Sequence, residues 1–408
     1  MSEIRLSDYF SGWCWKRLSA VETDPEISNQ HEFNGVARLV QLFGRDRREN
    51  FPSLFVYLSD TAADTISCDG RLTWYDARER NPFRTEYRLY YQDNPVMDAA
   101  SEGDLLVVAL TRTGNILVIV AREGSVSERQ IAWLFGLEPT PRFRVARPES
   151  RPPVPGFAAR HILALIGIDT EPERHPDALV HLLVDRFGND FPTTRAFSAF
   201  ARETLGNAVD PQADPDGCLV KWIDHEETLF RLFERHLFER RLEKRFEDIE
   251  DFIGFAKSIL QRRKSRAGFA LENHLEEIFR VNGISYSRCR ITENKSKPDF
   301  VLPGIEYYRN PAFPPDLLTV VGAKYSCKDR WRQVLSEAAR VRQKHLVTLE
   351  PAITEAQTAE MRDSGVQLVV PHPLHSTYSP AQRKWLMDVK DLLGLAAERQ
   401  DAAKRVTR

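Results

Sequence analysis

The chain has 408 residues, of which 42% are hydrophobic and 28% charged, and its formal net charge is -2. This composition predicts a soluble globular protein of two or three domains, and no apolar run approaches the roughly 20 residues that span a bilayer. The N-terminus has no secretory pattern, so we expect a cytoplasmic protein. The five scattered cysteines form no CxxC pair, which argues against a disulfide framework or a structural zinc site. The near-neutral charge gives no bulk attraction to nucleic acid.

Residues 1–140 are predicted to form a β-rich domain. Apolar, β-branched stretches separated by polar turns indicate strands at 54–58, 89–91, 105–110 and 116–120. A helix is expected at 127–135. From Glu138 to Gly156 there are six prolines and four arginines with little periodicity, which predicts a linker at residues 141–157.

A second domain is predicted for residues 158–398, beginning with helices. Apolar residues at helical spacing occur near 178–205, and the stretch 226–263 is interpreted as two charged helices. A third helix is expected to carry Glu272, with an apolar face of Leu271, Leu275, Ile278 and Phe279. The Asn282-Gly283 pair is a typical stop for this helix.

Beyond Gly283 the pattern alternates between strands and helices. Strands are expected at 284–291, 299–302, 317–326, 345–349 and 366–370. Helices are expected at 328–342, 353–363 and 380–398. The alternation predicts an α/β fold with a mixed sheet flanked by helices, and the polar residues 399–408 are expected to form a flexible tail.

Three residues in this sheet form the pattern with the clearest chemistry. Asp299 follows a proline at the start of one predicted strand, and Lys324 lies near the end of the next. Adjacent strands bring both side chains to one edge. Glu337 lies in the following predicted helix, one position off its apolar face, where it can lean over the same edge; Glu272 is a further carboxylate. Hydrolysis of a phosphodiester needs a hard cation with oxygen ligands, which two carboxylates supply for Mg²⁺, and a lysine beside the cation can orient the attacking water.

Each of these residues also has an ordinary structural interpretation. Asp299 can cap a strand, Lys324 can extend from a strand end, and Glu337 can be a solvated helix residue. Two basic clusters favour the chemical interpretation because they bracket the carboxylates, although such runs are often solvated helix faces. They span residues 262–266 (RRKSR) and 328–332 (KDRWR), each expected to open a helix, where Arg and Lys suit phosphate contact and the reading of guanine.

The same segments carry a family resemblance. Residues 262–272 (RRKSRAGFALE), 297–303 (KPDFVLP), 327–333 (CKDRWRQ) with Glu337, and 361–371 (MRDSGVQLVVP) resemble the EcoRII family of type II restriction endonucleases over roughly residues 245–385. The resemblance implies a restriction-endonuclease-like PD-(D/E)XK fold and Mg²⁺ as cofactor. It further implies Asp299, Lys324, Glu337 and Glu272 as the active site, with Asp299 and Glu337 as metal ligands. DNA contacts are implied for Arg262, Lys328, Arg330 and Arg332. One departure is Gly322-Ala323 before the lysine, which changes local packing.

The N-terminal domain is similar to that family more loosely. The match implies a B3-like pseudobarrel that holds a DNA site between two arms, the first near residues 15–20 and the second at 84–88. DNA contacts are then expected from Lys16, Arg17, His31, Arg84, Glu86 and Arg88. Residues 22–30 and Pro82 depart from the family pattern, which puts the sequence read by this domain in doubt, and the arginines can equally be exposed strand-end residues.

The resemblance implies a homodimer that cuts double-stranded DNA at a CC(A/T)GG-like site, a cognate methyltransferase that protects the host, and an N-terminal effector domain that restrains cutting until a second site binds. Two other functions stay open: a DNA-binding regulator with an inactive nuclease fold, and a repair or branch-specific nuclease. A tyrosine nucleophile at Tyr307 or Tyr308 is a weaker alternative than an ordinary loop aromatic. His274, His345 and Cys327 are expected to be packed residues.

Overall fold

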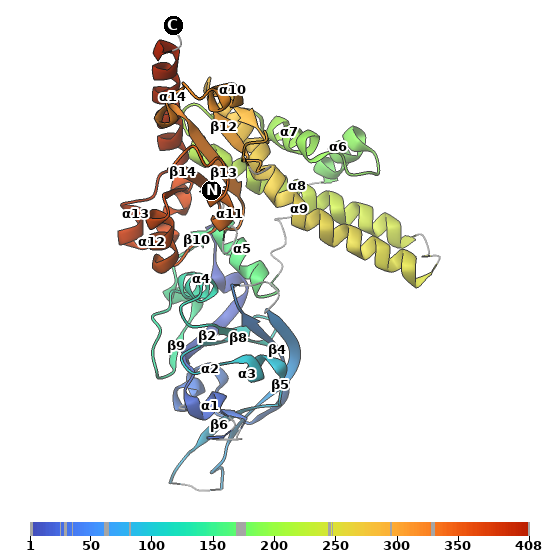
Figure 1. Cartoon of the computed structure of the whole chain (residues 1–408). Coiled ribbons are helices and arrows are strands. Elements are labelled where there is room, and N and C mark those ends of the chain that lie inside the picture. The colour runs from blue at the N-terminus through green and yellow to red at the C-terminus, as the bar shows by residue number, and fades with distance from the viewer. Residues whose placement is uncertain are drawn as a thin grey trace. The chain divides into compact units, whose positions relative to one another are not determined.

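The computed structural model describes residues 3–24, 26–27, 31–34, 36–60, 65–80, 83–168, 177–243, 246, 248–293, 296–327 and 331–406 (Figure 1). The chain divides into two compact units. The N-terminal unit comprises residues 1–170 with 351–354, and the C-terminal unit comprises residues 171–350 with 355–408. Within the described ranges, no helix is both long and apolar enough to cross a membrane.

The N-terminal unit is built on an eight-stranded sheet in the order β3-β6-β5-β4-β8-β7-β2-β9. All pairings are antiparallel except that of β4 with β8. The strands are β2 (Phe10–Arg17), β3 (Glu32–Phe33), β4 (Arg48–Leu58), β5 (Ile66–Asp76), β6 (Tyr87–Tyr91), β7 (Leu105–Thr111), β8 (Ile116–Ala121) and β9 (Arg144–Ala146). The four strands predicted from sequence are among them. Short helices α1 (Ala20–Thr23), α2 (Val40–Phe43) and α3 (Pro95–Ala99) and the longer α4 (Val126–Phe135) complete this part.

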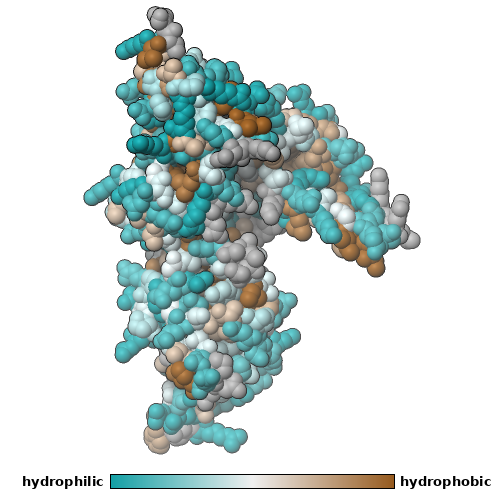
Figure 2. Space-filling model, in the orientation of Figure 1, coloured by the Kyte–Doolittle hydropathy of each residue, from teal (hydrophilic) through white to brown (hydrophobic). Residues whose placement is uncertain are grey.

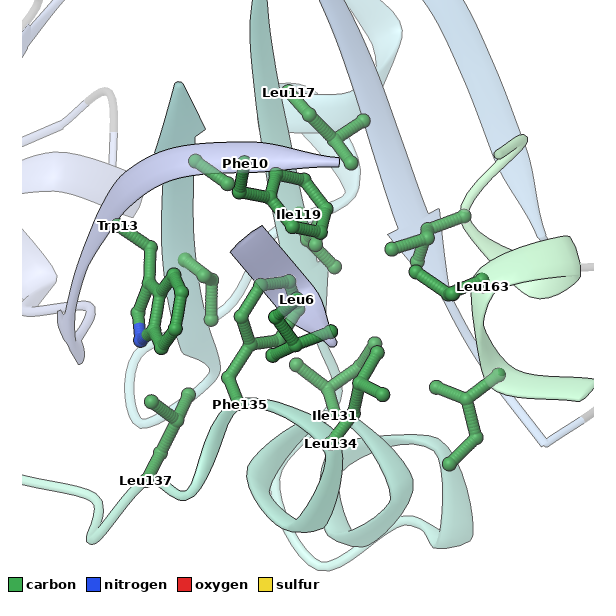
Figure 3. Packing of buried hydrophobic residues seen from close by; sticks show 14 of the residues in the cluster. Leu6, Phe10, Trp13, Leu117, Ile119, Ile131, Leu134, Phe135, Leu137 and Leu163 are labelled. Atoms are coloured by element: carbon green, nitrogen blue, oxygen red, sulfur yellow. The ribbon is translucent and has the colours of Figure 1, made fainter. Parts of the chain in front are cut away.

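Both faces of the central strands are buried, so this sheet supports two cores. Successive side chains on a strand point to opposite faces. In β7, Leu105 and Val107 therefore join one core, whereas Leu106 and Val108 join the other. Figure 3 shows the first core, where Phe135 of α4 meets Phe10 and Trp13 with ring centroids 5.2 Å apart in each pair.

The predicted linker at residues 141–157 belongs to this unit instead. Strand β9 pairs with β2, and β10 (Val154–Pro155) pairs with β1 (Glu3–Ile4). Helix α5 (Gly156–Leu165) then packs Ala159, Ile162 and Leu163 into the first core. Pro155 lies in the short strand β10, and the segment as a whole packs as part of this unit rather than forming a connector.

The C-terminal unit begins with four helices. They are α6 (Asp177–Phe187), α7 (Thr194–Leu205), α8 (Pro215–Glu243) and α9 (Ile249–Val281). Ion pairs such as Arg241–Asp251 and Arg263–Glu234 join α8 to α9 in antiparallel order. Apolar surface gathers at the far end of this hairpin (Figure 2), where the exposed side chains include Leu242, Ile249 and Phe252.

Helix α9 corrects one prediction. It runs unbroken for 33 residues from its N-cap Asp248 to Asn282, and Gly283 follows with a φ of 69° as its expected stop. The basic cluster at 262–266 therefore lies in the middle of a helix. Because its amides are already used in the helix, the cluster does not offer the phosphate-binding N-terminus that we expected.

A five-stranded mixed sheet follows, as predicted, in the order β11-β12-β13-β14-β15. The first two pairings are antiparallel and the last two parallel. The strands are β11 (Ser287–Arg288), β12 (Phe300–Leu302), β13 (Thr319–Lys324), β14 (Lys344–Thr348) and β15 (Val366–Val369). The flanking helices are α10 (Ile305–Arg309), α11 (Trp331–Leu335), α12 (Glu355–Asp363), α13 (Pro380–Arg383) and α14 (Val389–Val406).

Two helix predictions in this unit are wrong in extent. The helix expected at 328–342 is described only as α11, and Ala338 has a φ of 50°, which a right-handed helix cannot contain. The final helix does not end near Glu398. It continues to Val406, so residues 399–406 are not a loose tail, and Ala403 is buried in a small core with Val320.

Candidate active site

Two strands of the mixed sheet bring Asp299 and Lys324 together. Asp299 immediately precedes β12 and is 7% exposed, and Lys324 is the last residue of β13. Because the strands are antiparallel, the start of one lies beside the end of the other. The Asp299 Oδ2 atom accepts hydrogen bonds from the Ala323 amide at 2.7 Å and from Lys324 Nζ at 2.8 Å. The predicted contact at one sheet edge is therefore present in the structure.

The ammonium of Lys324 stays charged in this setting. Burial lowers its pKa, but the charge and hydrogen bond of Asp299 outweigh that effect, with a further contribution from Glu337, and the pKa is raised. Lys324 is therefore a hydrogen-bond donor and a source of positive charge. It is not a proton acceptor.

Glu337 reaches the same group from a turn rather than from a helix. Its amide bonds the Val334 carbonyl at the end of α11. Among the described residues, its buried Oε2 atom finds no hydrogen-bond partner. Burial and the charge of Asp299 together raise the pKa of Glu337 to about 7, although the charges of Lys324 and Lys344 oppose the rise. A half-buried carboxylate with one unpartnered oxygen is a place where a cation would be stabilising.

Glu272 approaches from α9. Burial raises the pKa of Glu272, as does the charge of Asp299, and Arg288 and Lys324 act in the opposite direction. Its Oε2 atom accepts a hydrogen bond from Arg288 at 2.9 Å. All four predicted catalytic side chains thus lie within electrostatic range of one another.

Two cations of this site escaped the sequence analysis. Arg288 on β11 binds Glu272, and Lys344, the first residue of β14, is 6% exposed with its Nζ on the Val341 carbonyl at 3.0 Å. Burial lowers the pKa of Lys344, and Glu337 opposes this shift. Neither residue belongs to a basic cluster, and only the pairing of strands distant in sequence places them here.

A two-carboxylate metal site fits these residues. Across the described ranges, no three His, Cys, Asp or Glu side chains are arranged to hold a metal ion. Mg²⁺ does not need three, because it keeps several waters and takes one or two carboxylates together with substrate phosphate. Asp299 and the unpartnered Glu337 provide hard oxygen donors of that kind.

The predicted DNA contacts of the C-terminal unit have mixed placements. Arg332 has a side chain that is 53% exposed, paired with Glu360 at 2.8 Å. Arg262 is half-buried with its guanidinium 4.4 Å from the centre of the Phe191 ring, and burial lowers its pKa. Lys328 and Arg330 lie outside the described residues. Arg332 is therefore the more accessible of the two described candidates.

The first predicted arm of the N-terminal unit is corrected in one respect. Lys16 is 3% exposed, and its Nζ lies 2.6 Å from Glu22 Oε2. An ammonium buried in an ion pair cannot reach a phosphate, so Lys16 does not contact DNA in this conformation. Arg17 is half-buried and donates to Glu128 Oε1 at 2.7 Å.

Residues of the second arm form a chain of ion pairs. Arg88 lies between Glu32 and Glu86, with 2.6 Å between its Nη1 and Glu32 Oε2. Hydrogen bonds from Arg78 and Arg88 lower the pKa of Glu86. Arg84 is exposed, and the His31 ring packs edge-on against Tyr91 at 5.7 Å. Arg78 was not expected in this group, since it lies before the arm in sequence.

The alternative residues are packed, as expected. Tyr308 is buried, its hydroxyl donates to Glu293 Oε2, and burial raises its pKa, which leaves it a poor nucleophile. His274 and Cys327 are also buried, and His345 is 1% exposed with a pKa that burial lowers to about 4.

Comparisons with known proteins identify relatives of the chain. A family model described as EcoRII C terminal matches residues 230–393. The type II restriction enzyme EcoRII of Escherichia coli is 31% identical over 410 residues, covering 97% of this chain and 97% of that enzyme. Among solved structures, metal-depleted Ecl18kI in complex with uncleaved DNA has a TM-score of 0.44 at 21% identity, over 56% of this chain and 86% of that one. The PspGI–substrate DNA complex has a TM-score of 0.44 at 17% identity, over 52% and 94%.

The mixed sheet with Asp299 and Lys324 at one edge is that of a restriction-endonuclease-like fold, and the class of protein is a site-specific deoxyribonuclease. The 31% identity to EcoRII extends over nearly the whole length of both chains, which assigns the protein to a particular family. The chain belongs to the EcoRII family of type II restriction endonucleases.

Proposed function

We propose that this chain hydrolyses double-stranded DNA at a short CC(A/T)GG-like sequence in a Mg²⁺-dependent reaction, with Asp299, Lys324 and Glu337 as catalytic residues. The supporting observation is the Asp299–Lys324 ion pair beside the unpartnered carboxylate oxygen of Glu337. Asp299 and Glu337 would hold the ion. When bound, a hard divalent cation supplies positive charge to the phosphate oxygens.

The chain's own residues act on the water and on the phosphate. Asp299 holds the Lys324 ammonium through Oδ2, so its donors have a fixed direction. The charged lysine orients the attacking water by donating a hydrogen bond to its oxygen. It also offsets the negative charge that develops as the water oxygen bonds to phosphorus and one P–O ester bond breaks. The water proton leaves to solvent or to the departing oxygen.

Plasmid cleavage tests the catalytic assignment. Lys324→Ala and Asp299→Ala are each expected to reduce cleavage at least about a hundredfold while DNA binding in a gel-shift assay stays measurable. Lys404→Ala is the matched control, because Lys404 is exposed on α14 and forms a surface ion pair with Asp401. Full cutting by either active-site variant would refute the assignment.

The two rival functions predict different products. An inactive DNA-binding regulator gives no cleavage with Mg²⁺ or with EDTA, and a branch-specific nuclease gives no discrete bands on linear plasmid DNA. We expect discrete bands with Mg²⁺ and none with EDTA. The Asp299–Lys324 pair disfavours the regulator, because a fold that had lost catalysis has no need of a half-buried ion pair at this edge.

We further propose a homodimer, in which each C-terminal unit cuts one strand and the two-fold axis matches a near-palindromic site, and a cognate methyltransferase that modifies the same site without direct contact. Size-exclusion chromatography with light scattering tests the dimer, since a monomer at working concentration would contradict it. Resistance of methylated plasmid to cutting tests the second statement, and cutting regardless of methylation would contradict that one.

The N-terminal unit is proposed to be a B3-like effector domain that binds a second DNA site and restrains cleavage. Exposed Arg84 and the paired Arg88 support this, because phosphate can compete with Glu32 and Glu86 for Arg88. A short duplex containing the site is expected to stimulate cutting of a one-site plasmid by the full chain. Arg84→Ala should weaken that stimulation, and equal stimulation of both proteins would contradict the role of Arg84.

A further inference from the structure

Arg288 makes three hydrogen bonds to one face of α9. Its Nη2 atom donates to Glu272 Oε2 at 2.9 Å, and its Nη1 atom donates to Asn273 Oδ1 at 2.9 Å and Glu276 Oε2 at 2.6 Å. The Arg288 side chain is 14% exposed and that of Glu272 is 13% exposed. The guanidinium also lies 5.8 Å from the centre of the Phe300 ring. These contacts fix its position as well as its charge.

The backbone fixes Arg288 relative to the active site. Strand β11 pairs with β12 in a register that sets Arg288 opposite Phe300. The next amide, that of Cys289, donates to the Asp299 carbonyl at 3.0 Å. Arg288 is therefore bound on one side to the strand that follows Asp299 and on the other side to Glu272. The separation of Glu272 from Asp299 depends on this link.

Without Arg288, the charges at this edge would not balance. Burial, and then the charge of Asp299, raise the pKa of Glu272, so the two carboxylates repel each other. Lys324 is directed at Asp299. A third carboxylate beside Asp299 and Glu337 would attract a second divalent cation, because hard cations bind where carboxylates cluster. A guanidinium stays protonated at every working pH, so it provides a permanent substitute for that second ion.

We infer that Arg288 is a positioning residue that holds Glu272 away from the divalent ion and restricts the active site to a single ion per chain. This inference rests on the proposed divalent-ion site at Asp299 and Glu337. It also fits the finding that, for the part of the chain that the structure describes, no three acidic, histidine or cysteine side chains are arranged around a common metal position.

Titration of the full chain with Mn²⁺, with free Mn²⁺ followed by electron paramagnetic resonance, tests the inference. The wild type is expected to bind one Mn²⁺ per chain. Arg288→Gln frees Glu272 and is expected to bind two, and the double variant Arg288→Gln with Glu272→Gln is expected to return to one. Arg280→Gln is the matched control: Arg280 is exposed on α9, the helix that carries Glu272, and it pairs with Glu277, so this variant should bind one.

The outcomes separate this inference from the proposed function. One ion in both the wild type and Arg288→Gln, or two ions in the wild type, overturns the role of Arg288 and leaves a metal-dependent nuclease. No bound Mn²⁺ in the wild type overturns the metal site itself. If circular dichroism shows that Arg288→Gln does not fold, Glu272→Gln alone decides. It is expected to keep its single ion with affinity changed by less than about tenfold, and loss of that ion would make Glu272 a direct ligand and refute the inference.

Discussion

Replacing Glu337 with glutamine should stabilise the metal-free protein above neutral pH. The folded chain raises the pKa of Glu337 from 4.5 to about 7, so folding favours its protonated form. The corresponding stabilisation is complete below pH 4.5 and is lost as the pH rises through about 7. At about 1.4 kcal/mol for each pH unit the full loss is about 3 kcal/mol. Because the side chain is only half-buried, we expect about 1 to 3 kcal/mol at pH 8.

Urea denaturation in EDTA measures this difference. Near pH 4.5, Glu337→Gln and wild type should have nearly equal free energies of unfolding. As the pH rises through about 7 the two values should diverge, with the variant more stable. Glu239→Gln is the control, since Glu239 is exposed in a surface pair with Arg235 and its replacement should change stability by less than about 0.5 kcal/mol at either pH. A difference between Glu337→Gln and wild type that does not change with pH would refute the raised pKa of Glu337 in the folded chain.

Two further predictions concern the surroundings of Glu337. A Cβ atom on Gly322 would lie 2.8 Å from Val334 of α11, so Gly322→Val should displace α11, lower the free energy of unfolding by about 1 to 3 kcal/mol in urea denaturation and slow plasmid cleavage. The control is Gly394→Ala on α14, which has open space and should have neither effect. Cleavage at the wild-type rate by Gly322→Val would contradict this packing. Lys344→Met removes a buried cation that acts on Glu337 and should change Mn²⁺ affinity by about tenfold or more, so an unchanged affinity in the same titration would show that Lys344 is only structural.

The sheet and the meeting of Asp299 with Lys324 at its edge were predictable because their signals are local. The run Leu105–Leu110 and the strands around Asp299 and Lys324 have apolar patterns that identify them without knowledge of their partners. Once two strands are adjacent, a residue at the start of one and a residue at the end of the next must meet if the pairing is antiparallel. The pairing found here is of that kind.

The rest depended on interactions that the sequence does not show. Glu337 fits a helical pattern after Trp331, but the helix ends at Leu335 and the backbone turns at Ala338, so the predicted helix does not continue to Arg342. Lys16 lies in a basic segment typical of a DNA-binding arm. The capping turn at the start of α1, however, places the Glu22 carboxylate against its ammonium. Arg288 and Lys344 are single charges on strands, and only the tertiary arrangement distinguishes them from surface residues.

Helix α11 connects a residue proposed to contact DNA, Arg332, to a residue proposed to bind the metal ion, Glu337. Its described part, Trp331–Leu335, is about 7.5 Å long, and it contains Arg332 and ends two residues before Glu337. Its residues Trp331 and Val334 are buried, and we expect the helix to move as one body. The choice of DNA site would then depend partly on movement of this helix. A wrong base beside Arg332 would shift the helix and move the Glu337 carboxylate away from the metal ion. Mn²⁺ should bind less tightly to the complex with a one-base-substituted duplex than to the complex with the cognate duplex, and equal affinities would show that the two ends act independently.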